Sequence, residues 1–486
     1  MHTLRLRVFV ALCVLFIVDR ENEAIRGATW RSCGKQRCMT ISGRGWGIAS
    51  SATNGSGSLR TGYSHYDSTS VPRSAGTTRS THSRSPARFV VVDVGEMRGR
   101  HRRRGTKAVI LHLAADYPNA NRRETTQAVR NFVLANHAVD HVVVALTRSA
   151  DPRRQNLLDG DGAGDGRVVS MRYWGLPKGL LLQLSMAIVV RRVRRLLAQR
   201  HVTVDLIHAH KLCYEGIAGY YLSRRLGVPL VCSVRGDSER LTLKFLPHYL
   251  PLFRRIAQHC QRLYYVSAWI RPVIEGRLGA PHSRGALLPN FCDGTSLAPA
   301  ELPDADRLVS ILHLDVFAKK GLDRLLAAFA QLARRHPGVT LDIIGRGAPA
   351  SIRQIEALID AGGLRDRARL LGPLPRAELL ARLPGYGAMC LPSHNETFGM
   401  VYVEALLSGV PILYSRGTGV DGFLDGIEGA VGVDPGSTDD ILAALETLRA
   451  DHARMRAWLI AHHDAVAERF AAEVHIDRYN RDLELT

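Results

Sequence analysis

Two series of strand and helix patterns follow one another along the chain, and this alternation limits the fold more than any other feature. The first runs from KAVILHLAADYP, which begins at residue 107, to a helix pattern at residues 270–277. The second runs from LVSILHLD (308–315) to the helix pattern DDILAALETLRA. Short apolar runs that alternate with amphipathic helices are typical of parallel sheets covered on both faces. We therefore predict an α/β protein with two Rossmann-like, doubly wound domains and a cleft between them.

The segment between the two series indicates where the domains divide. LLPNFCDG, followed by SLAPAELPDADR, is rich in proline and acidic residues and is typical of an interdomain linker. A chain of 486 residues is also too long for one hydrophobic core. We expect a basic low-complexity leader (1–104), an N-terminal domain (105–300), a C-terminal domain (301–470) and a C-terminal tail or helix (471–486).

Most of the positive charge lies in the leader. The formal net charge is +20, and residues 1–104 contribute +12 of it. The rest is only weakly basic, which argues against nucleic-acid binding. Residues 41–88 are rich in Ser, Thr, Gly and Arg, so we expect disorder there. The apolar run 8–18 has the length of a signal-peptide core, so a membrane or export role is an alternative. Against this role, the run is short for a membrane span, and no small-residue cleavage site follows it.

The eight cysteines show no C-x-x-C spacing, and five of them are scattered singly through apolar segments. This distribution indicates reduced thiols rather than a disulfide framework or a zinc site. We therefore predict a cytoplasmic protein that binds no metal.

The stretch NETFGMVYVEALLSG carries two acidic residues in an apolar context. We expect Glu396 in a loop after the strand pattern AMCLPS, and Glu404 about two turns along the next helix. The backbone N–H groups at the predicted helix start, those of Phe398, Gly399 and Met400, suit an anion such as a diphosphate. Because carboxylates would repel that anion, we expect both to face sugar and ribose hydroxyls.

Two further motifs fall at predicted strand ends, where doubly wound sheets bind their ligands. DIIGRG places Gly345 and Gly347 in a turn that equally fits a plain strand-to-helix connection. DVFAKKGLD places Lys319 and Lys320 before a helix, where they either neutralise phosphate charge or are solvated surface residues.

The first series offers candidates at two strand ends. LIHAHKLCYEG puts His208 and His210 on one face of a strand, as structural or functional residues, with His210 the stronger functional candidate. SVRGD puts Arg235 at the next strand end. We expect it either to meet the same phosphates from across the cleft or to form a salt bridge with Asp237.

PSHNETFGMVYVEALLSGVPIL resembles the E-x7-E signature of retaining glycosyltransferases with the GT-B fold, in the family 4 group (glycosyl transferases group 1 type). KKGLDRLLAAF, DIIGRG, LLPNFCDG and YYVSAW also follow the order of that family, and the resemblance covers roughly residues 107–470. It implies a hexosyltransferase that moves a sugar from a nucleotide-diphosphate sugar to a glycan or lipid-linked acceptor, with retention, in bacterial polysaccharide or glycoconjugate synthesis. The N-terminal domain would hold the acceptor and the C-terminal domain the donor, which is a substrate rather than a cofactor.

The resemblance also implies roles for individual residues. Glu404 would hold the ribose hydroxyls, Glu396 would orient the transferred sugar, and Lys320 would stabilise the leaving diphosphate. The predicted catalytic set is Glu396, Lys320, His210 and Arg235. The amides at the helix start would meet the donor's sugar and phosphates, and the two glycines would shape the base pocket. The predicted donor-binding residues are Glu404, Phe398, Gly399, Met400, Gly345, Gly347 and Lys319.

The sequence departs from the family pattern at three places. Leu314-Asp315 stands where family members usually have Gly-Arg, so Lys319 or Arg235 would take over from the missing arginine. Arg235-Gly236 stands where His-Gly is frequent, and AADYPNANRRE replaces a glycine-rich acceptor-side loop.

Two other functions stay open. Asp315 motivates a non-catalytic, nucleotide-sugar-binding partner on the same fold. The leader and the basic pattern VVRRVRRLLAQR (189–200) motivate a nucleic-acid or anionic-membrane binder. The partners we expect are a nucleotide-sugar donor and a glycan or lipid-linked acceptor, with no nucleic acid. Peripheral contact with the inner membrane face is an alternative to a plain surface helix.

Overall fold

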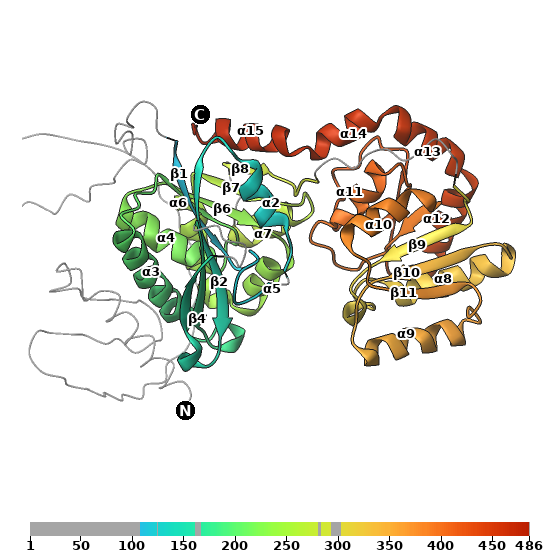
Figure 1. Ribbon diagram of the computed structural model, residues 1–486, viewed down its shortest axis with the longest axis horizontal. Helices are drawn as coiled ribbons and strands as arrows, with labels where there is room; N and C mark the ends of the chain where they lie inside the picture. The colour runs from blue at the N-terminus through green and yellow to red at the C-terminus, as the bar shows by residue number, and fades with distance from the viewer. Residues whose placement is uncertain (1–106, 124, 161–166, 280–282, 293–302, 486) are drawn as a thin grey trace, which may run out of the picture. The chain divides into compact units, whose positions relative to one another are not determined.

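The computed structural model describes residues 107–123, 125–160, 167–279, 283–292 and 303–485. The predicted leader and the central part of the predicted linker lie outside these ranges. The described residues form two α/β domains, each built on one sheet of mostly parallel strands (Figure 1).

The N-terminal sheet has eight strands in the order β3-β4-β2-β1-β5-β6-β7-β8. Every neighbouring pair is parallel except β3 and β4. Its strands are β1 (Val109–Ala114), β2 (Asp140–Ser149), β3 (Asn156–Asp159), β4 (Val168–Trp174), β5 (Leu206–Ala209), β6 (Leu230–Val234), β7 (Arg262–Tyr265) and β8 (Gly285–Leu287). The chain order reverses between β1 and β5, so this is the switch point at which doubly wound sheets bind ligands.

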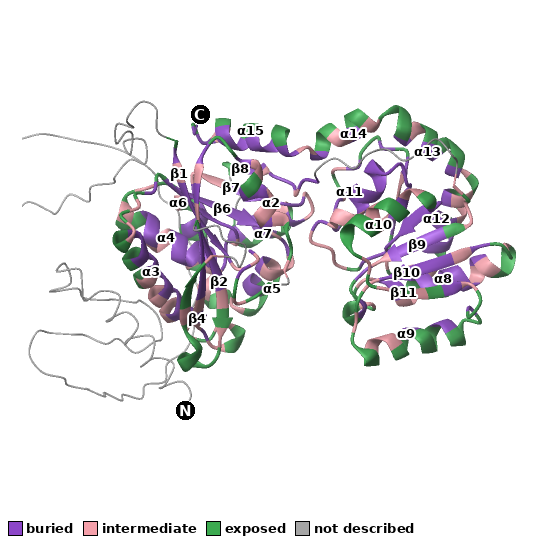
Figure 2. Ribbon diagram, viewed as in Figure 1, coloured by how far each residue is buried: buried purple, intermediate pink, exposed green. Residues whose placement is uncertain are grey.

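Helices cover both faces of this sheet, and alternate strand residues therefore enter two different cores. Side chains of α3, α4, α6 and α7 share one core with Leu111, Leu113 and Ile207, whereas α2 and α15 pack on the opposite face. Figure 2 shows that the strands are mostly buried. The helices are α2 (Ala128–Ala135), α3 (Leu182–Gln199), α4 (Glu215–Leu226), α5 (Asp237–Phe245), α6 (Leu250–His259) and α7 (Ile270–Leu278).

The C-terminal sheet has six parallel strands in the order β11-β10-β9-β12-β13-β14. They are β9 (Arg307–Ile311), β10 (Thr340–Ile344), β11 (Ala368–Gly372), β12 (Ala388–Cys390), β13 (Ile412–Ser415) and β14 (Ala430–Val433). The order reverses between β9 and β12, which is the nucleotide-binding position of a Rossmann fold. The helices that follow the strands are α8 (Leu322–Arg335), α9 (Pro349–Ala361), α10 (Arg376–Arg382), α11 (Met400–Leu407), α12 (Thr438–Ala450), α13 (His452–Ala461) and α14 (His463–Phe470).

The last helix, α15 (Ala472–Asp482), packs on the N-terminal sheet rather than on the C-terminal one. The Tyr479 ring lies 5.0 Å from that of Phe132 and is stacked on that of His208. Asn480 exchanges two side-chain hydrogen bonds with Asn136, at 2.8 and 3.1 Å. The segment predicted as a tail or helix is therefore a helix that completes the core on this face.

The two-sheet prediction is confirmed, while some element boundaries were wrong. The pattern RRETTQAVRNFVLANH (122–137) indicates one continuous helix, but α2 begins only at Ala128. The helix predicted from Phe398 begins at Met400, because Gly399 before it is left-handed (φ +83°). The sequence patterns did not indicate β3, β4, β8, α5, α13 or α14.

Within the described ranges, no helix is both long enough and apolar enough to cross a bilayer. The arginine-rich helix α3 spans 18 residues and buries Met186, Val189 and Val193 against the sheet. Five free cysteines are buried, as their apolar contexts indicated: Cys213, Cys232, Cys260, Cys292 and Cys390.

Candidate active site

The switch point of the C-terminal sheet brings together two of the predicted catalytic residues. Lys320 lies after β9 and Glu396 after β12, so the loops that carry them leave neighbouring parallel strands at the same edge. The Nζ of Lys320 donates a hydrogen bond to Oε2 of Glu396, and both side chains are largely buried. The site thus holds a matched positive and negative charge.

A glycine sets the position of the lysine. Gly321 has a φ of +70°, and a Cβ at this position would lie 1.9 Å from the carbonyl oxygen of Pro392. The lysine loop and the loop after β12 therefore touch through their backbones. The N–H of His394 also donates to the carbonyl of Lys319 at 3.0 Å. Only glycine allows this close approach.

The backbone of Glu396 is fixed by the loop after β13. Its N–H donates to Oγ1 of Thr418 (2.8 Å), and the Thr418 hydroxyl donates back to the Glu396 carbonyl (2.9 Å). Gly419 donates its N–H to the same carbonyl at 3.0 Å. The sequence prediction missed Thr418. The only local signal was the run GTG, one residue after a strand, which is typical of a tight turn.

The second carboxylate of the pair has a different partner. Glu404 lies in α11 and is 8% exposed. Its Oε1 accepts a hydrogen bond from Nε of Arg376 at 3.0 Å and lies 2.9 Å from Nη2 of the same guanidinium. Arg376 is the first residue of α10 and was also not predicted. The two glutamates, eight positions apart, are therefore neutralised separately, one by a lysine and one by an arginine.

The three residues predicted to offer amides have distinct environments. Phe398 is 1% exposed, and its ring packs 6.2 Å from that of Phe470, so its side chain is part of the core. Gly399 is the residue before α11, and a Cβ there would lie 2.4 Å from the Tyr402 ring. Met400 is the first helical residue. Gly399 and Met400 therefore lie at the helix start, while Phe398 lies outside the helix.

The two glycines of DIIGRG pack against the chain that follows β9. A Cβ at Gly345 would lie 1.8 Å from the carbonyl oxygen of Leu312, and one at Gly347 would lie 2.6 Å from Cβ of Leu314. Neither position accommodates a side chain. This close packing explains both glycines without a ligand, and their predicted part in a base pocket stays a prediction.

Asp315, the residue that replaces the expected arginine, caps a helix. Its Oδ1 accepts from the N–H of Ala348 (2.7 Å) and from the hydroxyl of Ser351 (2.8 Å), where α9 begins. These hydrogen bonds hold the pKa of the Asp315 carboxyl below its usual value. Its carboxylate thus has a local structural function, as a capping residue supplied from outside the helix.

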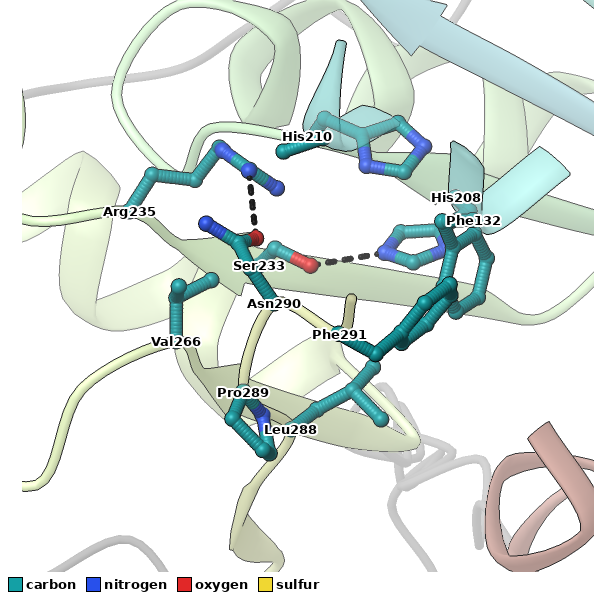
Figure 3. A pocket seen from close by; sticks show the side chains of 11 residues that line it. Phe132, His208, His210, Ser233, Arg235, Val266, Leu288, Pro289, Asn290 and Phe291 are labelled. Atoms are coloured by element: carbon teal, nitrogen blue, oxygen red, sulfur yellow. Dashed lines mark hydrogen bonds between the residues drawn. The ribbon is translucent and has the colours of Figure 1, made fainter. Parts of the chain in front are cut away.

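The switch point of the N-terminal sheet holds the other predicted residues. A small cavity of about 20 Å³, roughly the space of one water molecule, is lined by α2, the ends of β5 and β6, and residues 288–291 (Figure 3). His210 and Arg235 both line it. Arg235 donates to Oδ1 of Asn290 at 2.9 Å. The expected salt bridge to Asp237 was wrong, because that carboxylate binds Lys319 at 2.9 Å and Arg240 at 3.1 Å instead.

Charged residues that follow β1 and β5, most of them largely buried, were not predicted. Lys211, after β5, pairs with Asp116, after β1, at 2.7 Å. Burial acts to raise the pKa of Asp116, but the charge and hydrogen bond of Lys211 lower it below its usual value. Burial raises the pKa of Glu215 to about 7, against the opposing effect of Lys211. Asp116 belongs to the AADYPNANRRE loop, so this loop supplies an acid where a glycine-rich loop was expected.

Two doubly wound parallel sheets in one chain, with charged side chains at the switch point of each, define the architecture of the GT-B glycosyltransferases. Solved structures share it. Sucrose-phosphate synthase from Thermosynechococcus elongatus superposes with a TM-score of 0.62 at 19% identity, over 78% of this chain and 98% of that one. Anabaena HepE in complex with UDP superposes with a TM-score of 0.60 at 16% identity, over 78% of this chain and 100% of that one.

Sequence comparison gives the family. Residues 126–295 match the model of Glycosyltransferase Family 4, and residues 301–461 match that of Glycosyl transferases group 1. The D-inositol 3-phosphate glycosyltransferase of Xylanimonas cellulosilytica is 35% identical over 305 residues, which are 57% of this chain and 71% of that protein. A GDP-mannose-dependent alpha-(1-6)-phosphatidylinositol monomannoside mannosyltransferase of Mycolicibacterium smegmatis is 28% identical over 58% of this chain and 76% of its own length. The chain belongs to the glycosyltransferases built from these two domains.

Proposed function

We propose that this protein transfers a hexose from a nucleotide-diphosphate sugar to a glycan or lipid-linked acceptor with retention of configuration. The observation that carries the proposal is the Lys320–Glu396 ion pair at the β9/β12 switch point. A cation suits a diphosphate leaving group, and a carboxylate beside it suits the hydroxyls of the transferred sugar. The reaction needs both groups at one edge of the sheet.

The roles of the side chains follow from their partners. Lys320 stabilises charge on the leaving diphosphate. Glu396 accepts hydrogen bonds from the sugar hydroxyls once Lys320 binds the donor phosphates. Glu404 accepts from the ribose hydroxyls while Arg376 balances its charge. His210 and Arg235 contact the substrates from the N-terminal sheet. The amides of Gly399 and Met400 meet the donor phosphates at the start of α11.

The names of relatives narrow the substrate classes for testing. Relatives act on inositol 3-phosphate and on a phosphatidylinositol monomannoside, one of them from GDP-mannose, and HepE was solved with UDP. We therefore propose a UDP- or GDP-hexose donor and a polar acceptor that carries a phosphate or a lipid-linked phosphate. The product would belong to bacterial glycoconjugate or polysaccharide synthesis.

A thermal-shift screen of the full chain with UDP- and GDP-sugars tests donor binding, because a ligand that binds only the folded state raises Tm by mass action. Transfer or slow donor hydrolysis is then followed by nucleotide release. Glu396→Gln should abolish transfer and still bind nucleotide. Glu446→Gln is the matched control, since that carboxylate pairs with Arg335 and His336 elsewhere in the C-terminal domain. Equal turnover for Glu396→Gln and wild type would refute the proposal.

A non-catalytic nucleotide-sugar-binding partner is the second candidate, favoured by Asp315 at the position of the expected arginine. It predicts donor stabilisation without transfer or hydrolysis with any acceptor. The helix cap that Asp315 provides gives this residue a structural reason to be acidic, so we place catalysis first.

We further propose that the protein works in the cytoplasm, at the inner membrane face when its acceptor is lipid-linked. The motivation is the three exposed arginines at positions 191, 194 and 195 of α3. Binding to anionic vesicles that weakens as salt increases would support this contact, and binding that ignores salt would contradict it.

A further inference from the structure

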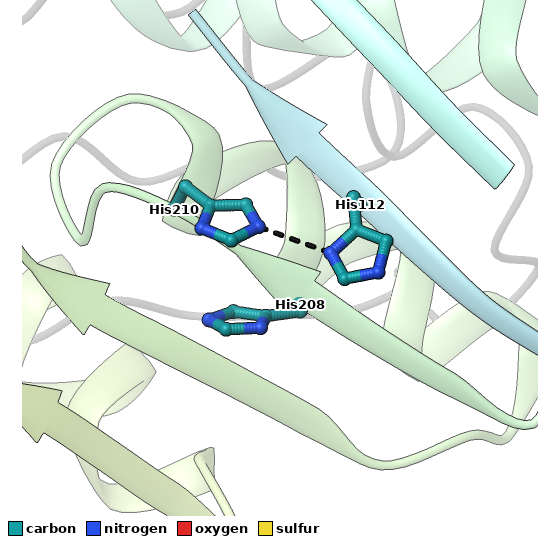
Figure 4. A group of neighbouring side chains, drawn as sticks. All are labelled: His112, His208 and His210. Atoms are coloured by element: carbon teal, nitrogen blue, oxygen red, sulfur yellow. Dashed lines mark hydrogen bonds between the residues drawn. The ribbon is translucent and has the colours of Figure 1, made fainter. Parts of the chain in front are cut away.

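Four histidines project from one face of the N-terminal sheet, the face covered by α2 and α15. His112 lies in β1, His141 in β2 and His208 in β5, and His210 follows β5 directly. Their neighbours Leu111, Leu113 and Ile207 enter the opposite core, which fixes the side to which the rings point. All four are buried, between 0% and 8% exposed. Figure 4 shows three of these rings gathered between β1 and β5.

Three of the rings form a continuous hydrogen-bonded chain that ends on one backbone carbonyl. The links are His210 Nε2 to His112 Nδ1 (3.0 Å), His112 Nε2 to His141 Nδ1 (2.9 Å) and His141 Nε2 to the carbonyl oxygen of Asn136 (2.7 Å). A carbonyl oxygen only accepts, so Nε2 of His141 must carry a hydrogen. The direction of every other bond in the chain follows from this one.

The proton positions can be worked out ring by ring. Burial lowers the pKa of these three histidines, so each is neutral and carries one ring hydrogen. His141 therefore accepts at Nδ1, which requires His112 to donate from Nε2 and accept at Nδ1. His210 must then donate from Nε2, and its Nδ1 is left with a lone pair.

That last nitrogen is the functional end of the chain. Nδ1 of His210 is buried and has no hydrogen-bond partner among the described residues. His210 is 3% exposed and lines the small cavity with Ser233, Arg235 and Asn290 (Figure 3). A buried acceptor without a partner is costly unless a ligand or a water supplies the donor.

We propose that His141 and His112 are positioning residues that lock His210 in the Nε2–H tautomer, so that its Nδ1 accepts a hydrogen bond from a substrate hydroxyl. Asn136 anchors the lock through its carbonyl, at the far end from the cavity. The identity of the hydroxyl, on a sugar or on the acceptor, rests on the proposed glycosyl transfer. The lock itself does not, because it is a property of the protein without substrate.

A metal ion is the competing reading of this cluster. Ligand atoms of His112, His208 and His210 lie within 4.8 Å of one another, and imidazole is a common zinc ligand. However, both nitrogens of His112 are engaged in the chain. His208 is also engaged, at Nε2 with the Ser233 hydroxyl (2.8 Å) and at Nδ1 with the Tyr479 hydroxyl (3.1 Å). A metal would have to break several of these bonds, so we favour the chain.

Substitutions at His141 distinguish control of the His210 tautomer from a purely structural role of the buried histidines. In His141→Phe, the Nε2–H of His112 has no acceptor, so that ring should change tautomer and donate from Nδ1. His210 must then accept at Nε2, and its hydrogen moves to Nδ1. His141→Gln keeps one donor and one acceptor and should preserve the original arrangement. His452→Phe removes a buried histidine of the C-terminal domain as a control.

The test is nitrogen NMR of the histidine rings in the full-length protein, labelled with ¹⁵N-histidine. His210→Asn identifies the His210 signals. We expect a non-protonated Nδ1 and a protonated Nε2 for His210 in the wild type, in His141→Gln and in His452→Phe, and the reverse in His141→Phe. With a donor and an acceptor that support transfer, His141→Phe should lower kcat, whereas His141→Gln should keep most of the wild-type kcat.

Three results would overturn the proposal. One is a protonated Nδ1 of His210, measured on the wild-type protein. Another is an unchanged His210 tautomer in folded His141→Phe. The third is stoichiometric Zn²⁺ binding that shifts the signals of His112, His208 and His210 together, which would assign the cluster to a metal. The Nε2–H tautomer of His210 in a protein without transferase activity would contradict the proposed function but not the tautomer lock.

Discussion

Arg376 holds Glu404 at a single carboxylate oxygen, Oε1, which accepts from Nε at 3.0 Å and lies 2.9 Å from Nη2. The guanidinium approaches from the exposed side, since the Arg376 side chain is 56% exposed and that of Glu404 only 11%. Glu404 is thus a largely buried carboxylate with its partner at the rim of the site.

This geometry gives the two residues unequal effects on donor binding. Hydrogen bonds to a charged group are worth about 1.5–3 kcal/mol, so Glu404→Ala should raise the donor Kd by about 10- to 100-fold. Arg376→Ala should have a smaller effect, because half-exposed ion pairs contribute about 0–1 kcal/mol. Isothermal titration with the donor found by thermal shift measures both. An arginine variant that loses as much affinity as the glutamate variant would refute the ribose role of Glu404.

The two neighbouring lysines should also differ. Lys320 is 20% exposed and pairs with Glu396, whereas Lys319 is 50% exposed and pairs with Asp237. Removing a group that stabilises developing charge costs about 10²- to 10³-fold in kcat, which we expect for Lys320→Ala. Lys319→Ala should lose less than about tenfold, because its charge is better screened. Steady-state nucleotide release measures both, and equal losses would argue against Lys320 as the leaving-group cation.

Gly321 should tolerate no side chain. A Cβ there would lie 1.9 Å from the carbonyl oxygen of Pro392, so Gly321→Ala should destabilise the protein by more than about 1 kcal/mol and displace Lys320. Gly276 in α7 is the matched control, because a Cβ there meets nothing within 4 Å. Gly276→Ala should be neutral or stabilising by up to about 1 kcal/mol. Urea unfolding compares the two, and similar values would contradict the contact.

Asp315 should matter for stability rather than for donor affinity. Asp315→Ala removes the acceptor for Ala348 and Ser351, so we expect a lower Tm and an unchanged donor Kd. Asp360→Ala, which breaks an exposed pair with Arg365, is the control. Tighter donor binding in Asp315→Ala would show instead that the acid repels the diphosphate.

The buried histidines should make the protein less stable in acid. Burial lowers the pKa of His208 to about 3, with a further contribution from Arg235. In the unfolded chain the pKa of this group is about 6.5, so below that pH the unfolded state binds more protons. Its contribution to the free energy of unfolding is therefore present above about pH 6.5 and is lost as the pH falls toward 3, by up to about 1.4 kcal/mol per pH unit.

Urea unfolding between about pH 7 and about pH 5 measures this dependence. His208→Phe should flatten the curve, and substitution of the exposed His248 should not change it. Glu215 acts in the opposite sense, because its raised pKa of about 7 favours the folded state at low pH, and this contribution is lost as the pH rises through 7. An equal slope for wild type and His208→Phe would contradict the neutral, buried state of that ring.

Strands and site residues that are encoded within one segment could be predicted from the sequence. Contacts between residues far apart in the chain could not. Continuous apolar runs such as VILHLA and LVCSV indicated buried parallel strands, because both of their faces are covered. Lys320 and Glu396 could be predicted because each follows a strand pattern within one motif. Arg376 and Thr418 could not, since they meet the two glutamates from 28 and 22 residues away.

The histidine chain was missed for the same reason. His112 lies 98 residues from His210 and 29 from His141, and they meet only because β2, β1 and β5 are neighbours in the sheet. No spacing within one segment encodes that order. Asp315 shows the converse, since a departure from the family pattern looked functional in sequence and is a helix cap in the structure.

The position of α15 affects the order in which the protein can fold. One face of the N-terminal sheet is closed by residues that follow the whole C-terminal domain, with Tyr479 against His208 and Asn480 against Asn136. During synthesis the first domain therefore emerges with the α15-covered part of this face, next to His208, still open to water. Its core is completed only after the second domain has left the ribosome, so the two domains are coupled in folding although each has its own sheet.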